Sequence, residues 1–154
     1  MTKAEADGLV EVLKNITSSK TFYIPPTGSS DIIELASIFN KQDWFLVDVN
    51  KGFKINTKRY TLQLRHRKST ILLRMEYGGP SHRNPDGEVV PCPHMHIWSD
   101  EPGAGPQGTG FAYPIPVVFS EPSVLHKTLR EFLNYTNARD VDSLRIIEQM
   151  EANN

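Results

Sequence analysis

Histidines separated by one residue are the clearest chemical signal in this sequence. Three of the five histidines and the only cysteine lie within residues 75–98. In a β-strand, positions such as His94 and His96 point to the same face of a sheet. Cys92 has the same parity, and His82 lies just upstream in a stretch rich in glycine and proline. The pattern predicts that these side chains belong to one site.

One chemistry for such a site is metal binding. Imidazole nitrogen and thiolate sulfur are donors that Zn²⁺ prefers, and four of them complete a tetrahedral shell. The metal candidates are His82, Cys92, His94 and His96, and Glu76 is a further donor that would complete the set. Structural zinc sites usually have two separated pairs of ligands, whereas this chain has one. We therefore expect no cofactor and keep zinc as the alternative.

The second chemistry is acid–base catalysis without a metal. Histidine titrates near neutral pH, so His82 and His94 are candidates to exchange protons with a substrate. His96 would lie beside them, and Glu76 would orient a histidine or an arginine. These four residues are the predicted catalytic set.

Arginines and aromatic residues extend this hypothesis to a phosphate-containing ligand. A guanidinium group binds phosphate as a fork, and aromatic rings stack on nucleic-acid bases. The candidates are Arg65, Arg67, Arg74 and Arg83 for phosphate, and Trp98 and Tyr113 for stacking. The sequence thus predicts a protein that binds RNA or another phosphate ligand. The strongest form of this hypothesis is a metal-independent ribonuclease.

Other interpretations stay open. A strand with one solvated face also alternates arginine, glutamine, glutamate and threonine outward, so residues 61–67 and 74–76 equally fit a plain surface. Residues 84–87, Asn-Pro-Asp-Gly, fit a simple turn. A chain of this kind would act as a non-enzymatic inhibitor or adaptor of a protein partner. The third alternative is a transition-metal protein that uses the histidine and cysteine ligands.

Strand-like segments provide the frame for these side chains. Apolar and polar residues alternate with the period of a half-buried strand in residues 44–50, 60–67, 71–77 and 94–98. A hairpin between the second and third segments, with Arg67 facing Thr70, would set Leu64 opposite Leu73. One face of this hairpin would then be apolar and the other polar.

The histidine segment fits the same sheet. Its apolar residues alternate with His94 and His96, so burial of the apolar set would turn both histidines to the opposite face. If this segment pairs with residues 71–77, that face also holds Arg74 and Glu76. The expected site is therefore the open face of an antiparallel sheet.

Helical spacing of apolar residues occurs towards both ends of the chain. Residues 2–16 begin with a capping box and predict a first helix. Residues 29–39 fit either a helix or a strand, and we favour a helix. We expect another helix over residues 124–133 and a last one from Asp140 onward.

Together these elements predict an α+β fold in a single domain, residues 1–154. Its antiparallel sheet would span about residues 44–119, including a short strand at residues 53–56. The N- and C-terminal helices would cover one face and leave the other for the site. A short flexible tail would end the chain.

Charge and composition limit the partners. The 154 residues carry a formal net charge of -1, so attraction for RNA has to come from a local basic cluster. No apolar run reaches the roughly 18 residues of a membrane span, and the N-terminus lacks the apolar centre of a signal peptide. With a single cysteine, which excludes an internal disulfide, we expect a cytoplasmic protein without membrane association.

Residues 44–116 resemble an uncharacterised bacterial family of similar length, classed as a domain of unknown function. The most specific blocks are His-x-Asn-Pro-Asp-Gly at residues 82–87 and Pro-Cys-Pro-His-x-His-Ile at residues 91–97. The resemblance implies that His82, Asp86 and the two downstream histidines form one unit. It implies no activity, although small orphan families of this kind point to a phage or mobile-element origin.

Overall fold

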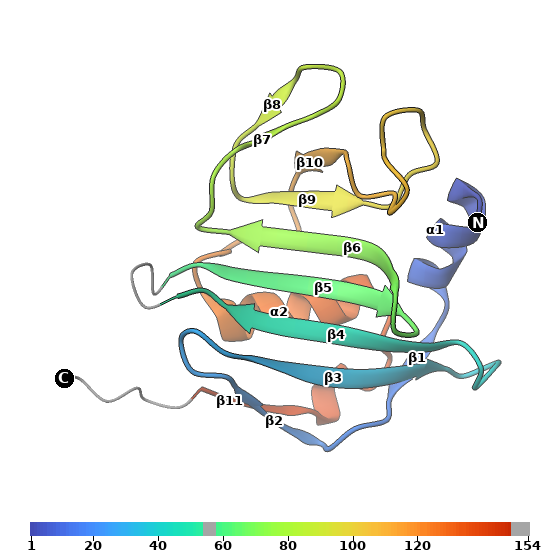
Figure 1. Cartoon of the computed structure of the whole chain (residues 1–154). Coiled ribbons are helices and arrows are strands. Elements are labelled where there is room, and N and C mark those ends of the chain that lie inside the picture. Colours follow the sequence, from blue (N-terminus) through green and yellow to red (C-terminus); the bar gives the residue numbers. More distant parts are fainter. Residues whose placement is uncertain (54–57, 149–154) are drawn as a thin grey trace.

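The computed structural model describes residues 1–53 and 58–148, and its centre is one large sheet (Figure 1). All neighbouring strands of this seven-stranded sheet are antiparallel. In spatial order they are β1 (Lys14–Ile16), β3 (Ser30–Ser37), β4 (Trp44–Lys51), β5 (Tyr60–His66), β6 (Thr70–Tyr77), β9 (His94–Ile97) and β10 (Ala112–Pro114). The predicted α+β fold with an antiparallel sheet is confirmed.

Smaller elements surround this sheet. Helix α2 lies across its back, and helix α1 lies near the ends of β6 and β9 (Figure 1). These elements are α1 (Lys3–Glu11), α2 (Leu125–Tyr135), the 3₁₀ turn η1 (Val141–Ser143), the parallel pair β2 (Thr21–Ile24) and β11 (Arg145–Glu148), and the hairpin β7 (His82–Arg83) with β8 (Val89–Val90). Neither helix in the described part of the chain has the length and apolar character that a membrane span requires.

The core lies between the back of the sheet and α2. Alternate residues of β4, including Val47 and Val49, are fully buried, as are Leu129 and Phe132 on one side of α2. Burial of every second strand residue against a helix leaves the remaining residues on the open face. Neither of the two described helices lies over the open face, as the sequence predicts (Figure 1).

The hairpin register is confirmed where it matters for the site. Leu64 pairs with Leu73 across β5 and β6, as expected from the alternation of apolar residues. Closer to the turn a β-bulge shifts the register, so that His66 rather than Arg67 pairs with Thr70. Arg67 instead takes a φ of 55° in the turn. The bulge accommodates one extra residue in β6 without moving the strand's far end.

Residues 29–39 form a strand rather than the favoured helix. Strand β3 pairs with β4 from Ser30 to Ala36, and Ile33 and Leu35 are 1% exposed whereas Ile32 is 41% exposed. This two-residue alternation follows from burial against the core, because the neighbouring strand satisfies the backbone groups of β3. The sheet consequently begins before residue 44.

Two further helix predictions are wrong in their extent or type. Helix α1 ends at Glu11, and Lys14–Ile16 form β1 at the edge of the sheet. After Asp140 the described residues form the 3₁₀ turn and then β11, which pairs with β2. In both places a partner strand distant in sequence overrides local helical spacing. The expected strand at residues 53–56 falls largely, and the expected tail wholly, outside the described residues.

Candidate functional site

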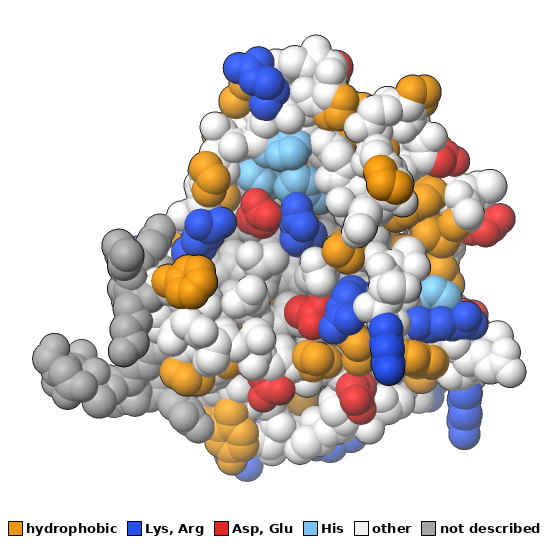
Figure 2. Space-filling model, in the orientation of Figure 1, with side chains coloured by type: hydrophobic (Ala, Val, Ile, Leu, Met, Phe, Trp, Pro, Cys, Tyr) orange, Lys and Arg blue, Asp and Glu red, His pale blue; other side chains and the backbone are white. Residues whose placement is uncertain are grey.

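Pairing of β6 with β9 brings the predicted residues together on the open face. His94 lies opposite Glu76, and His96 lies opposite Arg74. Figure 2 shows histidine atoms on this face, with acidic and basic side chains directly beside them. The expectation that both histidines turn away from the core and meet Arg74 and Glu76 is met by this register.

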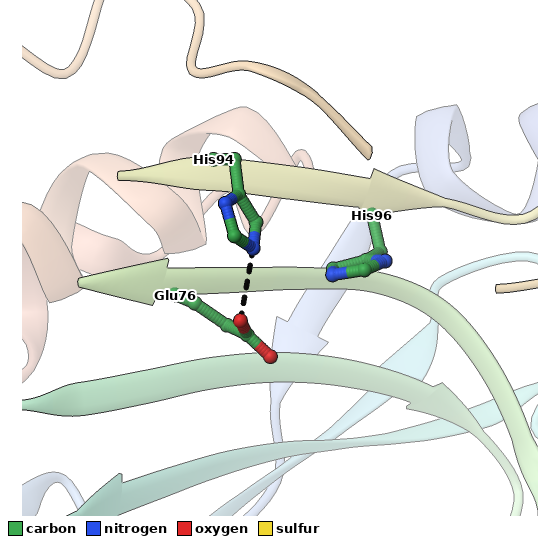
Figure 3. A group of neighbouring side chains, drawn as sticks. All are labelled: Glu76, His94 and His96. Atoms are coloured by element: carbon green, nitrogen blue, oxygen red, sulfur yellow. Dashed lines mark hydrogen bonds and ion pairs between the residues drawn. The ribbon is translucent and has the colours of Figure 1, made fainter. Parts of the chain in front are cut away.

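His94 contacts the carboxylate of Glu76. Its Nε2 lies 2.9 Å from Glu76 Oε2, and Figure 3 shows the two side chains reaching towards each other from adjacent strands. Because a carboxylate only accepts, the imidazole N–H donates. The other nitrogen, Nδ1, is buried without a hydrogen-bond partner in the described part of the chain, and the whole residue is 1% exposed. An unsatisfied buried polar atom of this kind invites a ligand or a water molecule.

The imidazole ring of His96 is oriented by a backbone carbonyl of the loop that contains Thr109. Its Nδ1 lies 2.9 Å from the carbonyl oxygen of Thr109, which only accepts, so Nδ1 carries the proton and Nε2 keeps its lone pair. Burial lowers the pKa of His96 to about 4; the Thr109 hydrogen bond acts in the opposite direction, and the charge of Arg74 lowers the pKa further. His96 is thus neutral at pH 7, the form that binds a metal ion.

His82 completes a group of three imidazoles. It lies on β7, and its ring centroid is 4.7 Å from that of His96 and 6.1 Å from that of His94. Its Nε2 donates to the carbonyl oxygen of Gly110, 2.9 Å away. The chain therefore gathers the three predicted histidines, each with one nitrogen held by a protein oxygen.

Asn84 fastens the β7–β8 hairpin over these histidines. Its side-chain amide donates to the carbonyl of Ala112, and its Oδ1 accepts from the N–H of the same residue, at 2.9 and 2.8 Å. The predicted turn is present, with Gly87 at a φ of 91°. The sequence predicts only a turn for Asn84, because nothing local indicates that its amide pairs with β10.

Three side chains could hold a metal ion together. Ligand atoms of Glu76, His94 and His96 all lie within 4.8 Å of one another, and they form the only group of this kind found among the described residues. The group shares two histidines with the predicted set but does not include His82 or Cys92. The thiol of Cys92 instead donates to the backbone carbonyl of Glu76, at 3.3 Å.

A protein family of unknown function, DUF6978, matches residues 1–138. The chain belongs to this family. The match covers more of the chain than residues 44–116, on which the sequence resemblance rests, and extends over α1, the whole sheet and α2. Comparison with curated proteins and with solved structures found no match.

Most of the arginines of this DUF6978 member are already engaged. Arg65 binds Asp48 with two nitrogens, at 2.7 and 2.8 Å, and this pair holds the pKa of Arg65 above its usual value. Arg67 donates to the carbonyl of Gln42, and Arg83 donates to a carbonyl of its own turn. Arg74 differs, because its Nε lies 3.1 Å from Glu76 Oε1 without an aligned hydrogen bond.

The two predicted stacking residues lie apart from the histidines. Tyr113 pairs with Met95, so it points to the side of β10 away from His96, where it is 41% exposed. Trp98 packs against the core, and its carbonyl accepts a hydrogen bond from Lys3 of α1. Neither ring forms a surface over the histidine group.

Proposed function

We propose that this protein binds a divalent transition-metal ion of the Zn²⁺ type through Glu76, His94 and His96. Two imidazoles and one carboxylate from adjacent strands form a donor set that suits zinc and related ions. The observation that carries the proposal is the convergence of these three ligand atoms at a buried position, with His96 neutral and presenting an unprotonated Nε2.

The spacing of the ligand atoms allows binding after a small movement. Ligands about 2.0 to 2.2 Å from a tetrahedral zinc ion lie roughly 3.3 Å from one another. The distances between the ligand atoms, which reach up to 4.8 Å, must therefore shrink by about 1.5 Å. Glu76 is the residue free to make this adjustment, since its side chain is 22% exposed while both histidines are packed beneath loops. Metal binding through His94 Nε2 would break its hydrogen bond to Glu76 Oε2, and the neutral His94 ring would then carry its proton on Nδ1.

Burial also bears on the phosphate and RNA hypothesis. His94 and His96 are 1% and 2% exposed, so a polymeric substrate would reach them only if the covering loops moved. A metal ion is small enough to enter beside Glu76 without such a movement. RNA cleavage, phosphate binding and a role as a protein inhibitor stay predictions, and the metal proposal agrees best with this geometry.

Metal titration of chelator-treated protein tests the proposal. We expect the wild type to bind about one equivalent of Zn²⁺ by calorimetry, and His96→Ala and Glu76→Gln to bind at least about 100-fold more weakly. His126→Ala is the matched control, because His126 lies exposed on α2 and pairs with Glu148. Wild-type protein that takes up less than about a tenth of an equivalent, with elemental analysis in agreement, would refute the proposal.

A further inference from the structure

We propose that the solvent-facing side of the metal site formed by Glu76, His94 and His96 binds a phosphate group. This group would lie between the metal ion and Arg74. The inference rests on the proposed metal function and names the ligand class of the same site. It starts from the guanidinium of Arg74, whose terminal nitrogens donate no hydrogen bond to the described part of the chain. The side chain is 29% exposed, so these donors face solvent beside the buried histidines.

A polar hollow lies one strand away from this position on the same face. It has a volume of about 330 Å³ and is lined by Ser30, Asp48, Asn50, Thr61, Gln63 and Arg65. Thr61 and Gln63 pair with Glu76 and Arg74 across β5 and β6, so the hollow neighbours the strand that carries Glu76. Figure 2 shows acidic and basic side chains next to the histidines on this face. A small polar ligand can therefore approach from this side.

Charge favours an anion at this place. A divalent ion, the Glu76 carboxylate and the Arg74 guanidinium together carry about two positive charges. Asp48 does not cancel this excess, because Arg65 pairs with it. A phosphate dianion matches the excess charge, and its oxygens fit both a metal ion and the fork of an arginine.

The coordination number provides the site for one phosphate oxygen. Zinc with three protein ligands keeps a fourth position for water or another ligand. Arg74 lies opposite His96 in the β6–β9 ladder and 3.1 Å from Glu76 Oε1, so its guanidinium would be close to an anion held by these ligands. The ligand class is thus a phosphate dianion, either as inorganic phosphate or as the terminal group of a phosphate monoester.

Cobalt-loaded protein tests this inference, because the visible spectrum of Co²⁺ reports on its ligands. We expect inorganic phosphate to change the spectrum of the wild type, with binding at least about tenfold weaker in Arg74→Gln and intermediate in Arg74→Lys. Arg145→Gln is the matched control, since Arg145 lies exposed on β11. Equilibrium dialysis must show that cobalt stays bound and that Arg74→Gln retains its cobalt affinity within about threefold.

The possible outcomes separate the two proposals. Wild-type protein that binds no cobalt overturns the metal function and this inference together. Protein that binds cobalt but shows no spectral response to phosphate, or an equal response in Arg74→Gln, overturns the inference alone. Parallel titrations with inorganic phosphate and a nucleoside monophosphate distinguish the two sources of the group, and tighter binding of the monophosphate would identify the ester as the ligand.

Discussion

Glu76 and His94 face each other across β6 and β9, with Oε2 and Nε2 2.9 Å apart and His94 almost fully buried. The contact links side chains of two neighbouring strands on the open face of the sheet. Since the carboxylate is the only hydrogen-bond partner of the His94 ring in the described part of the chain, the contact matters for stability even before any metal is bound.

The first prediction concerns this contact in metal-free protein. Glu76→Ala should lower the free energy of unfolding by about 1 to 3 kcal/mol, because it leaves a buried imidazole without a partner. Urea denaturation in the presence of a chelator measures the change. Glu148→Ala is the control, since it removes an exposed contact to His126 and should change stability by less than about 0.5 kcal/mol. Equal effects of the two substitutions would contradict a structural role for Glu76.

The second prediction concerns the loop that orients His96. Gly108 has a φ of 72°, and a Cβ at this position would collide with the ring of Trp98. Gly105 has a similar φ of 77° but open space around it. Gly108→Ala should therefore be less stable than Gly105→Ala by about 1 to 3 kcal/mol, as expected for overpacking. It should also weaken zinc binding, because the neighbouring carbonyl of Thr109 holds the His96 ring.

Urea denaturation and zinc titration of both glycine variants check this prediction. Backbone strain is common to the two substitutions, so their difference isolates the clash with Trp98. Identical unfolding midpoints would show that the loop adjusts without cost and that Trp98 does not fix its position.

The third prediction concerns Asn84. Asn84→Ala should lower the free energy of unfolding by about 2 kcal/mol, since it deletes two hydrogen bonds to the backbone of Ala112 at a buried position. Hydrogen exchange gives a local readout: the amide of Ala112 should lose protection, while that of Leu64 in the centre of the sheet should change only with global stability. Unchanged protection of Ala112 would mean that β8 and β10 stay together without this side chain.

The fourth prediction is a pH dependence that arises from Lys14. Its ammonium group is fully buried, donates to the carbonyls of Val10, Val12 and Thr136, and lies 4.6 Å from the centre of the Phe45 ring. Burial lowers the pKa of Lys14 from 10.5 to about 7. Between these values the unfolded chain binds the proton that the folded chain has released, so stability rises with pH.

Lys14→Met should remove this rise. In wild-type protein the Lys14 contribution to the free energy of unfolding should increase from pH 7 to 9.5 by up to about 1.4 kcal/mol per pH unit. Denaturation curves of the wild type, Lys14→Met and the exposed control Lys41→Met over this range measure the slope. If Lys14→Met has the slope of the wild type, the carbonyl acceptors keep Lys14 charged and the pH dependence comes from other groups.

Local alternation was sufficient to predict part of this fold. Residues 60–67 and 71–77 predicted the central hairpin and its register, because side-chain parity in a strand is a property of the backbone itself. The same argument placed His94 and His96 on one face. Two other strands were harder to predict. Strand β3 and strand β11 carry apolar spacings that also suit helices, and only their partner strands decide the outcome.

Strand parity predicts which side chains share a face, since it needs no knowledge of distant segments. The pairing of distant segments places Glu76 rather than Cys92 with His94 and His96, and it brings the carbonyls of Thr109 and Gly110 to the imidazole rings of His96 and His82. The physical reason is that a strand leaves its hydrogen bonds and its neighbours to be supplied by other segments. The pairing of β6 with β9 brings the ligand atoms of Glu76, His94 and His96 together in one buried group.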